Sequence, residues 1–315
     1  MSEVLERRHA AFYARSSGVS ERVAERDIVL TYVLRILSDS ILPRLAFKGG
    51  TCLKKMYFGK TGRFSMDLDF TTASIKLEEL KNELKQLLHK KASYGLDFKI
   101  IDENLSPESY LAVVEYAHNW NPSSDFEFQV SYRELPVLPA VELPLSTEMY
   151  FRFCEFQSFS VKCMQKEELL AEKIRAAFQR IRSMDLYDLY LFSKRPYDKD
   201  TVKTLAVIKC WNARDPFNSE TLLSRVANAD YDWDDLQRLV RKGSLPSQED
   251  VIKTVLKDYA FLKELDEPLP TIVEDSKAHR ESELVARLVS NLKVAAHAPA
   301  NKKQNKKEDS SKNPK

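Results

Sequence analysis

The spacing of hydrophobic residues along this chain changes from helical to extended and then back to helical. Between residues 20 and 42, apolar side chains such as Ile28, Tyr32 and Ile36 recur every three or four positions, which predicts a helix with one buried face. Strand-like segments follow to about residue 163, broken by the turn-rich Asn119 to Asp125 and the proline-spaced Leu135 to Leu145. From about residue 165 the helical spacing returns, in the segments Thr201 to Asn212, Ser219 to Arg225, Trp233 to Val240 and Gln248 to Lys263.

This order of elements predicts an α+β protein with four parts. We expect a helical segment over residues 1–44 that packs on a mixed-sheet core over 45–165, followed by an α-helical C-terminal domain over 166–292. The last part, 293–315, is predicted to be a disordered basic tail. From Ala298 to Lys315 it holds six lysines against two acidic residues, and it has no large apolar side chain. Such a tail can bind RNA electrostatically or simply remain solvated.

Two adjacent glycines mark the most distinctive stretch of the chain. Only seven glycines occur in 315 residues, yet Gly49 and Gly50 stand together between an apolar approach and a helix-like run from Thr51 to Phe58. This pattern is typical of backbone that comes close to a ligand, and the free amides at a helix start suit a phosphate group. We therefore predict that this turn binds the phosphates of a nucleotide.

Two aspartates follow the turn. The pattern from Phe64 to Thr71 predicts a strand, in which Asp67 and Asp69 point to the same face because side chains alternate. Neighbouring carboxylates repel each other, and a divalent cation held between them removes that repulsion. We predict that both aspartates bind Mg²⁺ or Mn²⁺, which also contacts substrate phosphates. A strand with a solvated polar face is the alternative, and the glycine pair upstream favours the metal site.

Residues 167 to 182 predict an amphipathic helix with a second candidate group. Its apolar stripe consists of Leu170, Ile174, Phe178 and Ile181. Lys173 falls on another face, where its ammonium can either bind phosphate oxygens or join an ordinary intrahelical pattern of glutamates and lysines.

Together these segments resemble the AbiEii-type nucleotidyltransferases. The first motif is Gly-Gly-Thr, a helix and then Arg-x-Ser-x-Asp-x-Asp-Phe, which ends at Phe70. The second is the Glu-Lys helix of residues 168–176, followed by Arg182 and the Asp-x-x-Asp element of Asp185 and Asp188. The resemblance covers roughly residues 45 to 195. It implies a polymerase beta-like nucleotidyltransferase fold and a role as the toxin half of a bacterial toxin-antitoxin or phage-defence (abortive infection) pair.

The resemblance also implies roles for individual residues. The catalytic set would be Asp67, Asp69, Lys173 and Asp188, with nucleotide contacts from Lys48, Gly49, Gly50, Thr51, Arg63, Ser65 and Lys173. In some relatives the serine that matches Ser65 is phosphorylated, and a phosphate there would oppose metal binding.

One position departs from the pattern. Enzymes of this fold commonly take a third carboxylate from a neighbouring strand, where this chain has Gln129 in the predicted strand Phe126 to Arg133. Glu127 lies on the same face of that strand and is a substitute ligand, or the site uses two aspartates alone.

Composition agrees with a cytoplasmic protein. No apolar run approaches the ~18 residues needed to cross a bilayer, and the first residues lack a signal-peptide core. The four cysteines are widely spaced, so neither a disulfide framework nor a zinc site is expected. The net charge is only +2, so any nucleic-acid surface must come from local clusters. The candidate clusters are Lys48, Lys54, Lys55, Lys60 and Arg63, and Lys162, Lys166, Lys173, Arg175, Arg180 and Arg182.

The sequence therefore predicts a metal-dependent nucleotidyltransferase toxin. The resemblance implies transfer of a nucleoside monophosphate from a nucleoside triphosphate to an RNA acceptor, the 3′ end of tRNA, with a cognate antitoxin as protein partner. Two alternatives stay open: an enzyme that modifies a protein hydroxyl, and an inactive module that binds nucleotide or RNA.

Overall fold

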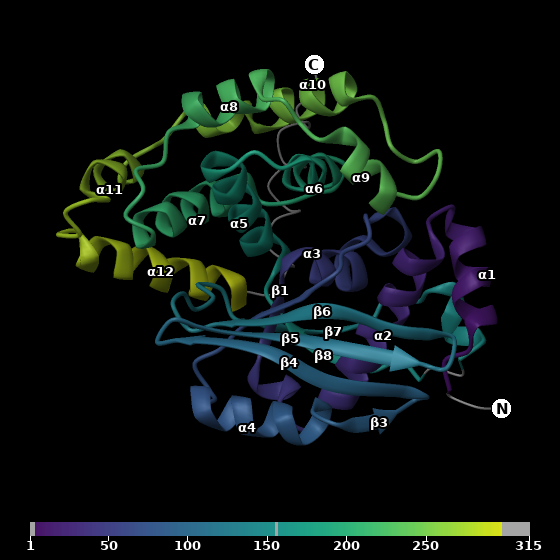
Figure 1. Cartoon of the computed structure of the whole chain (residues 1–315). Coiled ribbons are helices and arrows are strands. Elements are labelled where there is room, and N and C mark those ends of the chain that lie inside the picture. The colour runs from purple at the N-terminus through teal and green to yellow at the C-terminus, as the bar shows by residue number, and fades with distance from the viewer. Residues whose placement is uncertain (1–3, 155–156, 298–315) are drawn as a thin grey trace, which may run out of the picture.

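An eight-stranded mixed sheet forms the base of the molecule in the computed structural model, which describes residues 4–154 and 157–297 (Figure 1). The strand order is β3-β4-β5-β6-β2-β1-β8-β7. The strands are β1 (Ala46–Lys48), β2 (Leu68–Thr71), β3 (Lys91–Ser93), β4 (Leu96–Ser106), β5 (Ser109–His118), β6 (Asn121–Ser131), β7 (Val141–Pro144) and β8 (Ser160–Cys163). The short strands β1 and β2 therefore lie in the middle of the sheet, and β2 runs parallel to β6 and antiparallel to β1.

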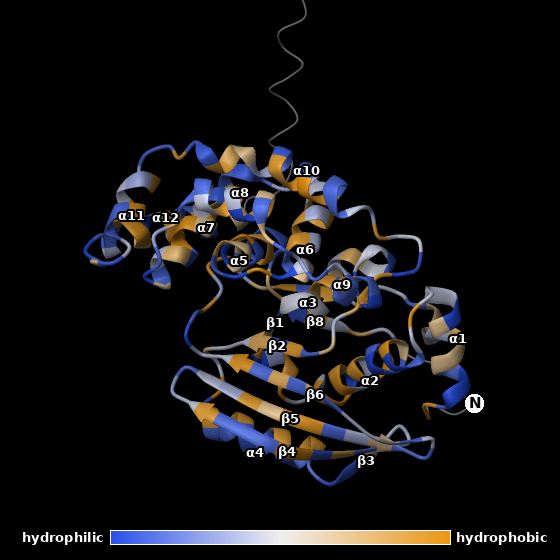
Figure 2. Cartoon of the chain, turned by 45° about the horizontal axis from the view of Figure 1, so that its top comes forward, coloured by the Kyte–Doolittle hydropathy of each residue, from blue (hydrophilic) through white to orange (hydrophobic). Residues whose placement is uncertain are grey.

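The N-terminal part is helical, as the spacing predicts. Helix α1 (Arg7–Ser17) packs on α2 (Glu21–Leu37), which begins where the hydroxyl of Ser20 accepts a hydrogen bond from the Val23 amide. Hydrophobic residues cover much of α2 (Figure 2), and most of the helix is buried.

The second half of the chain is helical and lies over the sheet (Figure 1). Its helices are α5 (Lys166–Gln179), α6 (Ser183–Ser193), α7 (Lys199–Asn212), α8 (Ser219–Asn228), α9 (Trp233–Leu239), α10 (Gln248–Asp258), α11 (Leu269–Asp275) and α12 (Ser282–His297), with a 3-10 turn over Tyr259–Lys263. The predicted α+β class is confirmed. No helix of the described residues is long and apolar enough to cross a membrane.

Several boundaries differ from the sequence prediction. Helix α4 (Leu77–Leu88) interrupts the expected run of strands, because Leu80, Leu84 and Leu88 bury one helical face. The turn expected over 119–125 is shorter, since β6 already pairs with β5 from Asn121.

Two helices, α5 and α12, end at different residues than the sequence predicts. Helix α5 stops at Gln179, which leaves Ile181 half exposed outside the predicted apolar stripe. Helix α12 extends to His297, five residues into the segment from 293 onward that we expected to be disordered. The rest of that segment, 298–315, lies outside the described residues.

Candidate functional site

Side chains of the candidate site pack closely against the two adjacent glycines, Gly49 and Gly50. Strand β1 ends at Lys48, and α3 (Gly49–Cys52) starts at once and continues into a π-helical segment, Leu53–Phe58. Gly49 has a φ of +74°, and a Cβ there would lie 2.1 Å from Oδ2 of Asp69. A Cβ on Gly50 would lie 2.8 Å from both Arg63 Nη2 and Ser65 Oγ. Gly49 has no room for a Cβ, and a Cβ on Gly50 would displace Arg63 or Ser65, so the two glycines let the predicted site residues converge on the start of this helix.

The two aspartates lie at the start of β2, in the middle of the sheet: Asp67 just before the strand and Asp69 within it. Asp69 is the second residue of β2, where it pairs in register with Lys48 on one side and Gln129 on the other. The predicted strand from Phe64 is shorter than expected, so Asp67 precedes β2, in an extended segment. Its Oδ1 accepts a hydrogen bond of 3.3 Å from the Glu127 amide. Glu127 therefore lies beside Asp67, and Gln129 beside Asp69.

Burial of these aspartates makes their negative charges costly. Burial raises the pKa of Asp69 to about 6, and the charge of Asp67 adds to the shift, although Lys48 and Lys173 oppose it. Burial also raises the pKa of Asp67. A pair of carboxylates that resists ionisation in this way is a ready site for a cation.

Helices α5 and α6 place a cationic group opposite the aspartates. Nζ of Lys173 lies 2.9 Å from Asp185 and 2.8 Å from Asp188. Asp188 also accepts two hydrogen bonds from Arg63, at 2.9 and 2.8 Å, so one buried carboxylate holds both cations. Burial disfavours the charge of Lys173, but Asp188 and Asp185 raise its pKa, and the ammonium stays protonated.

A buried ion cluster behind the site was not predicted from the sequence. Glu172 lies 3.6 Å from Lys48 and 3.5 Å from Lys209, which is fully buried in α7. Burial alone would raise the pKa of Glu172, but the charges of Lys48, Lys209 and Arg175 lower it to about 2. Glu172 thus stays ionised and holds Lys48 at the edge of the site. The chain separations are too long for any local pattern to reveal these pairs.

One cavity of about 550 Å³ joins these groups. Of the predicted residues, it is lined by Lys48, Gly49, Gly50, Arg63, Ser65, Asp67, Asp69 and Lys173. Two others lie behind its wall. The hydroxyl of Thr51 donates to the Asp67 carbonyl, and Asp188 is buried beneath Lys173. Further lining residues that the sequence did not single out for this site include Arg133, Glu172, Gln179, Met184 and Leu239.

Of the first basic cluster predicted from the sequence, Lys48 and Arg63 line the cavity, and Lys54, Lys55 and Lys60 do not. Lys54 pairs with Glu148 in the interior, and Lys55 pairs with Asp27 at 2.9 Å. Both lysines are buried and belong to the packing of the π-helical segment, because that segment faces the core.

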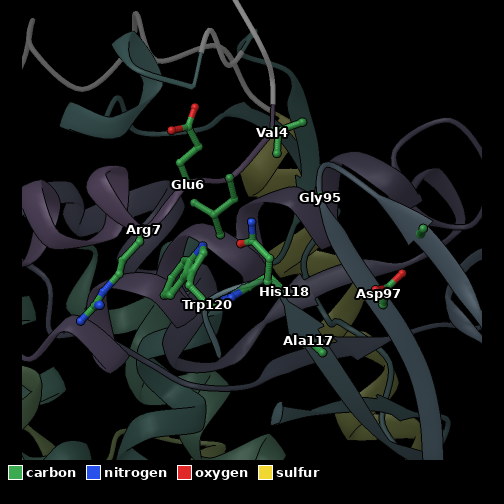
Figure 3. A pocket seen from close by; sticks show the side chains of 11 residues that line it. Val4, Glu6, Arg7, Gly95, Asp97, Ala117, His118 and Trp120 are labelled. Carbon is green, nitrogen blue, oxygen red and sulfur yellow. The ribbon is translucent and has the colours of Figure 1, made fainter. Parts of the chain in front are cut away.

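A larger cavity, of about 680 Å³, lies elsewhere and shares no lining residue with the site (Figure 3). It opens beside the N-terminal segment and the β4–β5 ribbon, where His118 stacks on Trp120 and bonds to Glu25 at 2.8 Å. It lacks the paired aspartates and the facing lysine, so its size does not make it the reactive site.

Comparison with known proteins identifies the relatives of this arrangement. The family model of the nucleotidyl transferase AbiEii toxin, type IV toxin-antitoxin system, matches residues 34–275. Among solved structures, the nucleotidyltransferase toxin MenT4 of Mycobacterium tuberculosis H37Rv is similar, with a TM-score of 0.80 and 24% identity over 92% of this chain and 99% of that one. A search of curated proteins found no match. The chain belongs to the AbiEii family of nucleotidyltransferase toxins, as its motifs predicted.

Proposed function

We propose that this nucleotidyltransferase transfers a nucleoside monophosphate to the 3′ end of tRNA, using Mg²⁺ held by Asp67 and Asp69. The observation that carries the proposal is that both aspartates, the Gly49-Gly50 turn and Lys173 line one cavity. As a member of a type IV toxin-antitoxin family, the protein has a nucleoside triphosphate substrate and an antitoxin partner.

The site fits a divalent cation. Asp67 and Asp69 offer hard oxygen ligands, and burial makes their uncompensated charges unfavourable. Among the described residues, no group of three His, Cys, Asp or Glu side chains is placed to hold a metal. Mg²⁺ usually keeps several water and phosphate ligands, so two carboxylates are enough, with Glu127 or Gln129 beside them as further oxygen donors. When bound, the ion neutralises charge that develops on the reacting phosphate.

The protein side chains position the triphosphate and balance its charge. Gly49 and Gly50, at the start of α3, line the cavity together with Lys48, and Lys173 and Arg63 add cations to the same cavity. Asp188 fixes both of these cations in place through its two carboxylate oxygens. The oxygen of the acceptor 3′ hydroxyl forms a bond to the α-phosphorus and its proton passes to solvent, while the bond from the α-phosphorus to the oxygen shared with the β-phosphate breaks and pyrophosphate leaves. Preorganised charge of this kind is the main source of catalysis in phosphoryl and nucleotidyl transfer.

The proposal is tested by transfer of label from each α-³²P nucleoside triphosphate, with Mg²⁺, to total tRNA. Wild-type protein should label tRNA with a preferred base, and both Asp67→Ala protein and EDTA should abolish the label. Label that appears on protein instead would identify a protein acceptor. A wild-type protein that labels neither acceptor, yet binds nucleotide, would refute the reaction.

A further inference from the structure

Two arginines differ from every other cation that lines the site cavity. Five cations there contact a carboxylate, within 2.5–3.6 Å: Lys48, Arg63, Lys173, Arg175 and Arg180. Arg133 and Arg182 also line the cavity, but within the described residues neither side chain has an ion pair or a hydrogen bond that fixes it. These two charges are not neutralised by the fold.

The two arginines come from different parts of the molecule. Arg133 follows β6, two residues after the strand ends, and Arg182 is the residue before the first turn of α6. Both are exposed, whereas Lys173 and Arg63 are at most 9% exposed beside the aspartates. The buried cations therefore lie at the floor of the cavity and the two arginines at its mouth, one on the sheet side and one on the helical side.

We infer that Arg133 and Arg182 bind backbone phosphates of a single-stranded nucleic-acid acceptor as its 3′ end enters the cavity. The inference rests on the proposed nucleotidyl transfer and adds the residues that recognise the acceptor strand. The paired cations in the cavity are available for the triphosphate. The two arginines at its mouth have no carboxylate partner, so they can bind additional anions from solvent. A nucleic-acid strand supplies a phosphate at every nucleotide, whereas an acceptor hydroxyl on a protein brings none.

Charge balance in the cavity supports this assignment. Seven cationic side chains line it against five carboxylates, and Asp188 and Glu134, which pair with three of these cations, bring the carboxylates to seven. The protein groups therefore balance, and a metal ion on Asp67 and Asp69 would make the cavity positive, with Arg133 and Arg182 as its unpaired cations. Arginine also suits this role because its planar guanidinium donates two parallel hydrogen bonds to a phosphate.

The test measures binding of a short fluorescent single-stranded RNA with a free 3′ end, without nucleotide, to wild-type protein and to Arg133→Gln, Arg182→Gln and the double variant. We expect the Kd for RNA to rise about tenfold for each arginine. The slope of log Kd against log salt should fall by about 0.7 for each lost phosphate contact. Arg287→Gln is the matched control, because Arg287 is exposed on α12 and does not line the cavity. Neither its Kd nor its slope should change.

Nucleotide binding separates this inference from the proposed function. Both single variants should bind nucleoside triphosphate with the wild-type Kd and unfold at the wild-type temperature. An unchanged salt slope for RNA, or a loss confined to nucleotide affinity, would overturn the assignment of the arginines even if tRNA labelling by the wild-type protein succeeds. Failure of wild-type protein to label any RNA would instead reject the proposed function, and RNA binding would still report on the two arginines.

Discussion

Replacing Gly49 with alanine should slow nucleotidyl transfer by about 100-fold or more in a protein that still folds. Gly49 has a φ of +74°, a left-handed conformation that costs an alanine about 1–2 kcal/mol. A domain of ordinary stability survives a loss of that size. The new Cβ would lie 2.1 Å from Oδ2 of Asp69, although ordinary contacts begin at 3.4 Å. Asp69 would therefore have to move by about 1.3 Å, away from its place beside Asp67.

A displacement of about 1 Å in a reacting group can lower a rate by about 100-fold. We therefore expect kcat for Gly49→Ala to fall by at least about that factor. Gly243→Ala is the matched control, because Gly243 has a φ of +78° and no atom lies within 4 Å of its added Cβ. It carries the backbone strain without the clash, so it should lose less stability than Gly49→Ala and keep its activity. The assay is the initial rate of label transfer at saturating nucleotide, together with urea unfolding of each variant. A wild-type rate in Gly49→Ala would refute the view that the absence of a side chain at position 49 keeps Asp69 in its reactive position.

Three further predictions concern buried charges. Asp188→Asn removes the negative charge that pairs with Arg63 and Lys173, so the free energy of unfolding in urea should fall by about 3 kcal/mol. The transfer rate should fall as well, and unchanged values of both would contradict this role of Asp188. The raised pKa of Asp69, about 6, means that the metal-free protein loses stability as the pH rises from about 4, the ordinary pKa of an aspartate, to about 6. In EDTA, thermal unfolding should therefore show Asp69→Asn to be more stable than wild type at pH 8, by up to about 3 kcal/mol, and no more stable at pH 4; an equal gain at both pH values would count against the shifted pKa. Lys209→Met leaves three glutamates without their shared cation, which should destabilise the fold by about 3 kcal/mol or more in urea; a stable variant would show that the cluster contributes little.

The sequence predicted the parts of the site that depend on local spacing. Gly49 and Gly50 are adjacent, and Asp67 and Asp69 are two residues apart, so each pair can be recognised within a few positions. The contact of Lys48 with Glu172 and that of Glu172 with Lys209 depend on how α5 and α7 pack over the sheet, and no period in the chain encodes this. Long-range ion pairs of this kind become visible only once the helices are placed.

Helix α4 differs from these ion pairs, because the sequence does encode it. Leu80, Leu84 and Leu88 recur every four residues, as in a helix, although the segment stands between residues that form strands. Lys54 and Lys55 are the opposite case. Two adjacent lysines are usually solvated, but here Glu148 and Asp27 neutralise them in the interior. Partners that lie far away in the chain decide the burial of the lysines, whereas local spacing is enough for α4.

Transfer of label to tRNA with an intact or a chemically blocked 3′ end shows whether the 3′ oxygen of tRNA is the acceptor. The same α-³²P nucleoside triphosphate, Mg²⁺ and wild-type protein would be used with untreated tRNA and with tRNA whose terminal ribose has been oxidised by periodate. We expect label on the untreated tRNA and none on the oxidised tRNA, because the 3′ oxygen is the attacking group. Equal labelling of both would contradict this expectation, since the nucleotide would then be joined elsewhere.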